Sequence, residues 1–171
     1  MNDIIVFTGP VQSGKTSFLR SLFEDRKDVS GFLCPDVNGL RCFFDLNSKE
    51  LLEFEVPHAG DGLSLINIGK FAFRSDVFDK AKRLISQASD ISSSFFIIDE
   101  IGKLELRGQG LEPELKILLH DRTSNINTLI VVVRDYLLDD VIKRYSLSDA
   151  VVIHIENKEE ILKLVSTLGK I

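Results

Sequence analysis

An eight-residue string near the start of the chain, Gly9 to Thr16, constrains the fold more than any other feature. It reads GPVQSGKT and fills every fixed position of the phosphate-loop pattern G-x-x-x-x-G-K-[ST]. The apolar run Ile4 to Phe7 before it predicts a buried strand, and Ser17 to Phe23 after it predicts a helix with one apolar face. A strand, a glycine-containing turn and a helix together present backbone N–H groups at a positive helix end. Such a site binds the phosphates of a nucleotide.

The residue types in this loop predict distinct roles. Gly9 and Gly14 allow backbone angles that a side chain would forbid. Lys15 is placed to reach the β- and γ-phosphates, and the hydroxyl of Thr16 is placed to coordinate Mg²⁺. The intervening residues contribute mainly main-chain donors, although Pro10 has none to give. The expected nucleotide-binding set is Gly9, Pro10, Val11, Gln12, Ser13, Gly14, Lys15, Thr16 and Ser17.

Composition limits the class of protein. The chain has 171 residues, of which 44% are hydrophobic, and this predicts one globular domain over residues 1–171. Its formal net charge is −5 and it has no dense basic run, so we expect no nucleic-acid partner. No apolar stretch approaches the length of a membrane span, and the amino terminus leads into a strand without a signal-peptide pattern. We therefore expect no membrane association and a cytoplasmic location.

The side chains that could hold a transition metal show no ligand pattern. Cys34 and Cys42 lie on neighbouring extended segments, and without an export signal we expect them to be reduced thiols. A two-cysteine metal site would lack its remaining ligands. The histidines have no ligand spacing and are expected to pack or to face solvent; they are His58, His120 and His154.

The segment after the first helix predicts antiparallel pairing. Short strands are expected at Gly31 to Pro35, Leu40 to Leu46 and Leu51 to Val56, because the gaps between them are too short for parallel crossovers. Asn38-Gly39 in the first gap is a strong hairpin-turn signal. A glycine-containing loop is expected at His58 to Gly62.

Beyond that loop, the chain alternates between extended and helical patterns. A brief extended piece around Leu65 to Phe73 precedes a helix at Asp76 to Ala88, with Ser75 or Asp76 as its cap. Further strands are expected at Phe95 to Ile98, Leu129 to Val133 and Val151 to Ile155, and helices at Pro113 to His120, Leu137 to Arg144 and Glu159 to Leu168. Continuous apolar strands between helices favour a parallel sheet covered on both faces. The predicted fold is α/β: a doubly wound P-loop sheet, mainly parallel, with an antiparallel hairpin insertion after the first helix.

Two acids end the strand Phe95 to Ile98 and form the second half of the expected site. In open α/β sheets ligands lie outside the carboxyl ends of strands, so Asp99 and Glu100 should emerge near the phosphate loop. Asp99 would accept from the water shell of Mg²⁺ or from Thr16. Glu100 would orient and polarise an attacking water.

The run Asp99 to Leu106, DEIGKLEL, closely resembles the D-E-I-G-K-M-E signature of a family of small P-loop nucleoside triphosphatases. That family was named from thermophilic prokaryotes and includes the vertebrate cancer-related nucleoside triphosphatase. Thr8 to Ser17, Gly31 to Phe44 and Ile68 to Phe71 are similar as well. The resemblance implies a single P-loop NTPase domain that hydrolyses ATP, GTP or other triphosphates to diphosphate and phosphate with Mg²⁺, slowly and with little base preference.

The chain departs from the family pattern at a few positions, namely Gln12, Ser17, Asp36, Cys42-Phe43 and Leu104. The changes in the loop and beside the acids leave phosphate binding intact in principle. Those around Asp36 and Cys42 bear on the nucleotide or partner preference.

Phosphoryl transfer also needs cations to stabilise charge in the transition state. Arg134 follows the strand Leu129 to Val133 and is the first candidate, because it should lie on the same rim as Asp99. Lys103, just past the acids, is the second candidate. Arg41, which matches an arginine of the family, is the third.

Other functions use the same loop. A kinase that phosphorylates a nucleotide or small metabolite usually covers the acceptor with an arginine-rich lid. Arg107 lies in a short loop without a cluster of arginines, which favours water as the acceptor. A nucleotide-gated interaction module that does not hydrolyse is disfavoured by Glu100 but stays open. The protein partners have no sequence signature.

A regulatory GTPase is not expected. Asn157-Lys158-Glu159-Glu160 approaches the guanine-reading pattern N-K-x-D, but Glu160 is longer than the required aspartate. Asn157 followed by Glu160 instead fits a helix cap and its return partner. The preferred base therefore has no convincing motif.

Overall fold

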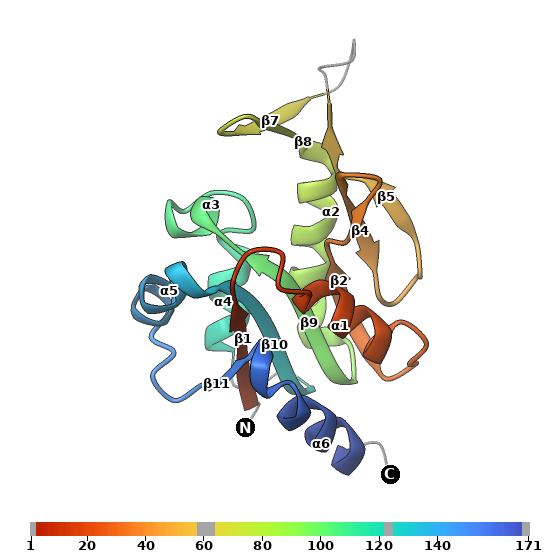
Figure 1. The fold of residues 1–171 in the computed structure, drawn as a ribbon, viewed down its shortest axis with the longest axis vertical. Helices are drawn as coiled ribbons and strands as arrows, with labels where there is room; N and C mark the ends of the chain where they lie inside the picture. Colours follow the sequence, from red (N-terminus) through yellow and green to blue (C-terminus); the bar gives the residue numbers. More distant parts are fainter. Residues whose placement is uncertain (1–2, 58–63, 122–124, 169–171) are drawn as a thin grey trace.

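The computed structural model describes residues 3–57, 64–121 and 125–168 (Figure 1). Within these ranges the main sheet contains eight strands: β1 (Asp3–Gly9), β2 (Val29–Leu33), β3 (Asp36–Val37), β4 (Leu40–Asp45), β5 (Leu51–Glu53), β9 (Ser93–Ile101), β10 (Ile126–Arg134) and β11 (Val151–His154). A smaller sheet contains β6 (Glu55–Val56), β7 (Leu65–Ile68) and β8 (Phe71–Arg74).

The helices of the same ranges are α1 (Lys15–Phe23), α2 (Ser75–Ser86), α3 (Lys103–Leu106), α4 (Glu114–His120), α5 (Leu138–Tyr145) and α6 (Glu159–Leu168). Short 3-10 turns are η1 (Ala88–Asp90), η2 (Asp135–Leu137) and η3 (Ile155–Asn157). No helix in the part of the chain that the structure describes is long and apolar enough to cross a membrane.

The main sheet is mostly parallel. Its strand order is β11-β1-β10-β9-β2-β4-β3, with β5 paired to β4. The strands from β11 to β2 pair in parallel, whereas β4 is antiparallel to β2 and to both of its own small partners. The predicted fold class, a doubly wound α/β sheet with an antiparallel insertion after the first helix, is confirmed.

Two cores lie on opposite faces of the sheet, because successive strand residues point to opposite sides. In β1, Ile5 and Phe7 pack with α1 and α6, while Ile4 and Val6 pack with α2, α4 and α5. The central strands are buried on both faces, so their sequences are continuously apolar rather than alternating. Figure 1 shows helices on both sides of the sheet and the small sheet extending from it beside α2.

The segment from β2 to β8 differs from the predicted run of hairpins. The segment predicted as Gly31 to Pro35 overlaps β2 (Val29–Leu33), which pairs in parallel with β9 as well as antiparallel with β4. The segment predicted as one strand, Leu51 to Val56, divides into β5 in the main sheet and β6 in the small sheet. The extended piece Leu65 to Phe73 is a hairpin of β7 and β8. The turn at Asn38-Gly39 joins β3 and β4 as predicted, with both residues at positive φ.

Both predicted helix caps are wrong. Arg74 occupies the N-cap of α2, so Ser75 and Asp76 are its first helical residues, and Asp76 instead pairs with Arg74. Asn157 lies in η3, two residues before α6 begins, and is therefore not its N-cap.

Cys34 and Cys42 are free thiols. Among the described residues, no group of three or more His, Cys, Asp or Glu side chains is arranged to hold a metal ion. His120 and His154 are exposed, and His58 and the predicted loop His58 to Gly62 lie outside the described residues.

Candidate active site at the phosphate loop

The phosphate loop leaves β1 at the carboxyl edge of the sheet, between two parallel neighbours. Gly9 is in register with Arg134 at the end of β10, and Thr8 is in register with His154 at the end of β11. Gly14 has φ +89° and is the N-cap residue of α1, so the loop turns directly into the helix. The backbone N–H groups of this first turn therefore face the space above the sheet edge.

Lys15 folds back onto its own loop. Its Nζ donates to the carbonyl oxygens of Gly9 (2.8 Å) and Pro10 (2.7 Å), and lies 3.4 Å from the hydroxyl of Ser13. The side chain is buried, and this burial lowers the pKa of the Lys15 amine below its usual value. A charged donor is thus held at the centre of the loop, where phosphate oxygens would replace the carbonyls.

Gln12 carries backbone strain at the tip of the loop. Its φ is +59°, in the left-handed region that glycine adopts without cost. A side chain in this region costs about 1–2 kcal/mol. The loop therefore places a non-glycine residue where its geometry favours glycine.

Gln12→Gly is expected to stabilise the protein. Relief of the strain outweighs the extra chain entropy of glycine and should leave a gain of about 1 kcal/mol, or a rise in Tm of about 2–4 °C. Lys49→Gly is the matched control, because Lys49 has φ +62° in an exposed turn remote from the loop. A thermal melt in which Lys49→Gly is stabilised and Gln12→Gly is not would mean that the side chain of Gln12 contributes more than its backbone costs.

The acid pair and the loop meet at Thr16 and Asp99. Oγ1 of Thr16 donates to Oδ2 of Asp99 at 2.6 Å, and the N–H of Cys34, just after β2, donates to the same oxygen at 3.1 Å. Asp99 is only 2% exposed. Burial, followed by the nearby charge of Glu100, raises the pKa of Asp99 to about 6. A buried carboxylate with neutral donors is electrostatically suited to a cation.

Glu100 points into the site because β9 has a bulge there. Val132 of β10 pairs with Asp99 and Val133 pairs with Ile101, so Glu100 is the extra residue. Bulges of this kind re-aim side chains next to active sites. Glu100 forms an ion pair with Arg134, whose Nη1 also donates to the hydroxyl of Tyr136 at 3.2 Å.

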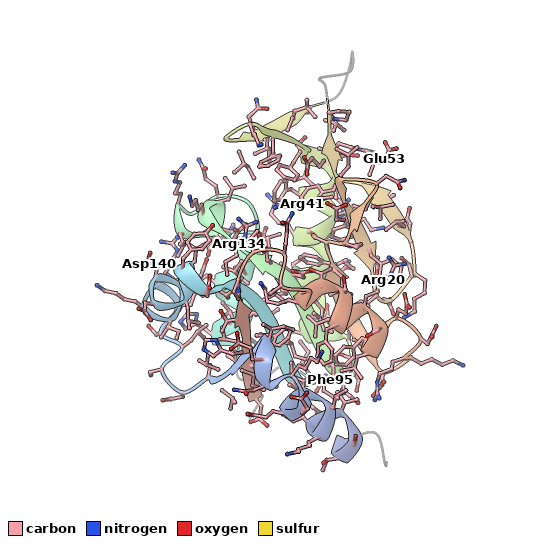
Figure 2. All side chains as sticks on the ribbon, viewed as in Figure 1. Arg20, Arg41, Glu53, Phe95, Arg134 and Asp140 are labelled. Atoms are coloured by element: carbon pink, nitrogen blue, oxygen red, sulfur yellow. The ribbon has the colours of Figure 1, made fainter. Side chains whose placement is uncertain are left out.

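A cavity of about 810 Å³ opens above these groups. Among the predicted site residues, those that line it are Val11, Gln12, Ser13, Gly14, Lys15, Thr16, Ser17, Arg41, Asp99, Glu100, Lys103 and Arg134. Gly9 and Pro10 do not line it, and their carbonyl oxygens face Lys15 instead. Arg134 at the end of β10 and Arg41 of β4 both line it (Figure 2).

The cations around the cavity come from separate segments. Lys103 and Arg107 line it from α3 and its C-cap, together with Arg41 of β4 and Arg134 of β10. The sequence prediction searched for arginines clustered within one loop, and it therefore missed this arrangement. A pattern search along the chain detects local clusters only.

Glu105 holds the segment that carries Lys103 and Arg107, a role that the sequence prediction did not assign. The carboxylate is 4% exposed and accepts from the N–H groups of Gly102 (2.8 Å) and Leu111 (3.1 Å). The carboxylate of Glu105 thereby connects the two ends of this segment, Gly102 and Leu111. The sequence did contain a signal for this role, because Glu105 is the last acid of the DEIGKLE run.

Comparisons with known proteins agree with this geometry. A sequence model of the family described as NTPase matches residues 4–166. The crystal structure of THEP1 from the hyperthermophile Aquifex aeolicus is 23% identical, with a TM-score of 0.72, and the match covers 98% of this chain and 99% of that chain. The solution structure of a human cancer-related nucleoside triphosphatase is 22% identical, with a TM-score of 0.62 and 99% and 98% coverage. These two likenesses show the fold. A search of curated protein sequences gave no match.

Proposed function

This chain belongs to the NTPase family, and we propose that it uses Mg²⁺ to hydrolyse nucleoside 5′-triphosphates to diphosphate and phosphate with little base preference. The observation that carries the proposal is the hydrogen bond between Thr16 and Asp99, which are 83 positions apart. It joins the phosphate-binding loop to the acid pair in one site. The family match over residues 4–166 also supports a single P-loop NTPase domain over the whole chain.

The donors at Thr16 and Asp99 fit Mg²⁺. This ion prefers hydroxyl, carboxylate and phosphate oxygens, and it usually takes only one or two protein ligands beside substrate phosphates. The partners of Asp99 are the neutral hydroxyl of Thr16 and the N–H of Cys34, so a cation here would neutralise a buried charge. When bound, Mg²⁺ would offset the negative charge of the β- and γ-phosphates.

The residues of the chain would divide the remaining work. Lys15 would exchange the carbonyl oxygens of its loop for oxygens of the β- and γ-phosphates. Glu100 would hold and polarise the attacking water in line with the bond to the leaving diphosphate. Arg134 would leave Glu100 for the γ-phosphate and stabilise its developing charge, with Lys103 as the second candidate for that role and Arg41 as the third.

The test is a product analysis of the purified chain with ATP, GTP, CTP and UTP in turn. We expect phosphate and diphosphate in equal amounts with Mg²⁺, and neither product when EDTA replaces the metal. The proposal fails if no triphosphate is hydrolysed, or if hydrolysis is equally fast without a divalent ion.

Asp99→Asn is expected to stabilise the metal-free protein above pH 6. The pKa of Asp99 is raised to about 6 in the folded chain, so between about pH 4 and 6 the folded state holds more protons than the unfolded state. Stability that is present below pH 4 is therefore lost as the pH rises to about 6. An asparagine amide oxygen accepts the same two hydrogen bonds without the buried charge, and the gain should be about 1–2 kcal/mol.

Urea denaturation of both forms in EDTA at pH 4.5 and pH 7.5 measures this effect. The advantage of Asp99→Asn should appear at pH 7.5 and shrink at pH 4.5, and only the unmutated protein should gain stability from Mg²⁺ with nucleotide. An advantage of equal size at both pH values would show that the charge of Asp99 is not its cause.

A further inference from the structure

The cavity reaches from the phosphate loop to the small sheet, where its wall contains aromatic side chains. We define the inner compartment as the part lined by Arg41, Phe54, Asn67, Phe71 and Phe73. These residues come from β4, from the β7–β8 hairpin and from the link between β5 and β6. None of them takes part in the hydrolysis described above, apart from the third-ranked role of Arg41.

The inner compartment and the phosphate loop line the same cavity. Lys15 and Thr16 mark the β- and γ-phosphate end of the loop. From Thr16, hydrogen bonds lead through Asp99 to Cys34, and from Cys34 the chain continues through β3 into β4, which carries Arg41. In phosphoryl transfer the attacking oxygen approaches opposite the leaving oxygen. Glu100, the group proposed to hold the attacking water, lines the same cavity as the compartment.

The compartment presents an aromatic surface with a planar cation. Phe71 is 38% exposed although its side chain lines the cavity, whereas Phe73 beside it is buried. The guanidinium carbon of Arg41 lies 5.8 Å from the centroids of both rings. Rings such as Phe71 stack on planar groups, and a guanidinium pairs with phosphate through two parallel hydrogen bonds.

The charges around the cavity favour an anion. Each of its acids is engaged by a donor of the protein: Asp36 by the N–H of Gly39, Asp99 by Thr16, Glu100 by Arg134, and Glu105 by the N–H groups of Gly102 and Leu111. No carboxylate of the described residues lies within 4.0 Å of the guanidinium of Arg41. Within the described part of the chain, the charge of Arg41 is therefore not offset by an ion pair.

We infer that the inner compartment binds a second ligand beside the triphosphate, a planar aromatic ring that carries a phosphate, as in a nucleoside monophosphate. The inference rests on the proposed function, because the bound triphosphate defines the position of the compartment. The ring stacks on Phe71 and the phosphate pairs with Arg41. The ligand then occupies the side from which water reaches the γ-phosphate.

Calorimetric titrations test the binding. The chain is first saturated with Mg²⁺ and a non-hydrolysable ATP analogue, so that the phosphate loop is filled, and it is then titrated with AMP, adenosine or ribose 5-phosphate. AMP should bind at least tenfold more tightly than either fragment, because only AMP carries both the ring and the charge. No binding of AMP at millimolar concentration, or equal binding of AMP and a fragment, overturns the inference.

Two variants assign the contacts. Phe71→Ala should weaken AMP about tenfold or more, which is the usual effect of losing a stacked base. Arg41→Gln should lower the affinity of AMP to that of adenosine. The matched controls are Ile117→Ala, 67% exposed on α4, and Arg20→Gln, whose guanidinium lies over Phe44 outside the cavity (Figure 2). Unchanged AMP binding in both compartment variants contradicts the assignment, and binding of the ATP analogue shows that each variant is folded.

Product analysis at saturating ATP tests the position of the compartment. AMP should reduce phosphate release by the unmutated chain, and Phe71→Ala should raise the AMP concentration needed for this reduction by about tenfold or more. If an oxygen of AMP attacks the γ-phosphorus while the bond to the β–γ bridging oxygen breaks, two ADP molecules form without free phosphate, and this result also supports the placement. Phosphate release that is unaffected by bound AMP overturns it. If ATP is not hydrolysed even without AMP, the proposed function fails, whereas the titrations remain interpretable.

Discussion

Lys15→Ala is expected to lower kcat/KM for triphosphate hydrolysis by ~10³-fold and to weaken nucleotide binding at the same time. Lys15 is the charged donor at the centre of the loop, and its Nζ already binds two loop carbonyls in the positions where phosphate oxygens would bind. Its contacts would form in the ground state and strengthen as charge develops on the phosphates. Removing both contributions costs about 4 kcal/mol, as for other preorganised donors in active sites.

Steady-state kinetics and calorimetric titration of the nucleotide separate the two effects. Lys116→Ala, on the exposed side of α4, is the control for loss of a lysine, and Lys15→Arg tests whether charge without the ammonium geometry suffices. The thermal melt of Lys15→Ala must resemble that of the unmutated chain for the comparison to hold. If Lys15→Ala binds and hydrolyses triphosphates normally, the phosphates bind elsewhere on the protein.

The local patterns of the sequence predicted the central sheet well, because its strands are buried on both faces. Ile5, Val6 and Phe7 are at most 1% exposed, so a continuous apolar run was the correct signal. The glycine-punctuated loop after β1 and the apolar face of α1 likewise depend on neighbouring residues only. The turn at Asn38-Gly39 is another feature that two adjacent residues determine.

The pairing of β2 could not be predicted in this way. Its parallel partner β9 is offset by 66 positions, as in the pair Val29 and Phe95. The short gap that follows β2 in the sequence indicates only its antiparallel partner β4. One residue does record the contact: Gly31 has φ +96°, and a Cβ there would lie 2.1 Å from the carbonyl oxygen of Ile97 in β9. The need for glycine at this position can be recognised only once the partner strand is known.

In the candidate site, too, some features have a local sequence motif and others depend on contacts between distant segments. The loop and the acid pair each have a local motif, and the parallel sheet predicts that their strands end on one edge. The ion pair between Glu100 and Arg134 depends on the bulge in β9, for which the sequence carries no pattern. The position of Arg41 depends on how β4 and the small sheet meet. Packing across the sheet, rather than spacing along the chain, gives these residues their neighbours.

Glu100→Gln is expected to spare triphosphate binding and to reduce turnover by ~10²-fold or more, the scale of a lost general base. The substitution is nearly isosteric, and the side chain is 25% exposed, so little packing is lost. Only the ability to hold and polarise water is removed. Single-turnover phosphate release measures the chemical step, and Glu24→Gln, which removes a surface ion pair with Arg20 on α1, is the matched control.

A double-mutant cycle with Arg134→Gln distinguishes two roles of Glu100. If Glu100 acts on water, the losses from Glu100→Gln and Arg134→Gln should combine, because they affect different parts of the transition state. If Glu100 only positions Arg134, each single variant should lose as much as the double variant. Turnover of the unmutated chain that is no faster than that of Glu100→Gln, with tight nucleotide binding in both, would instead favour a nucleotide-gated interaction module over a hydrolase.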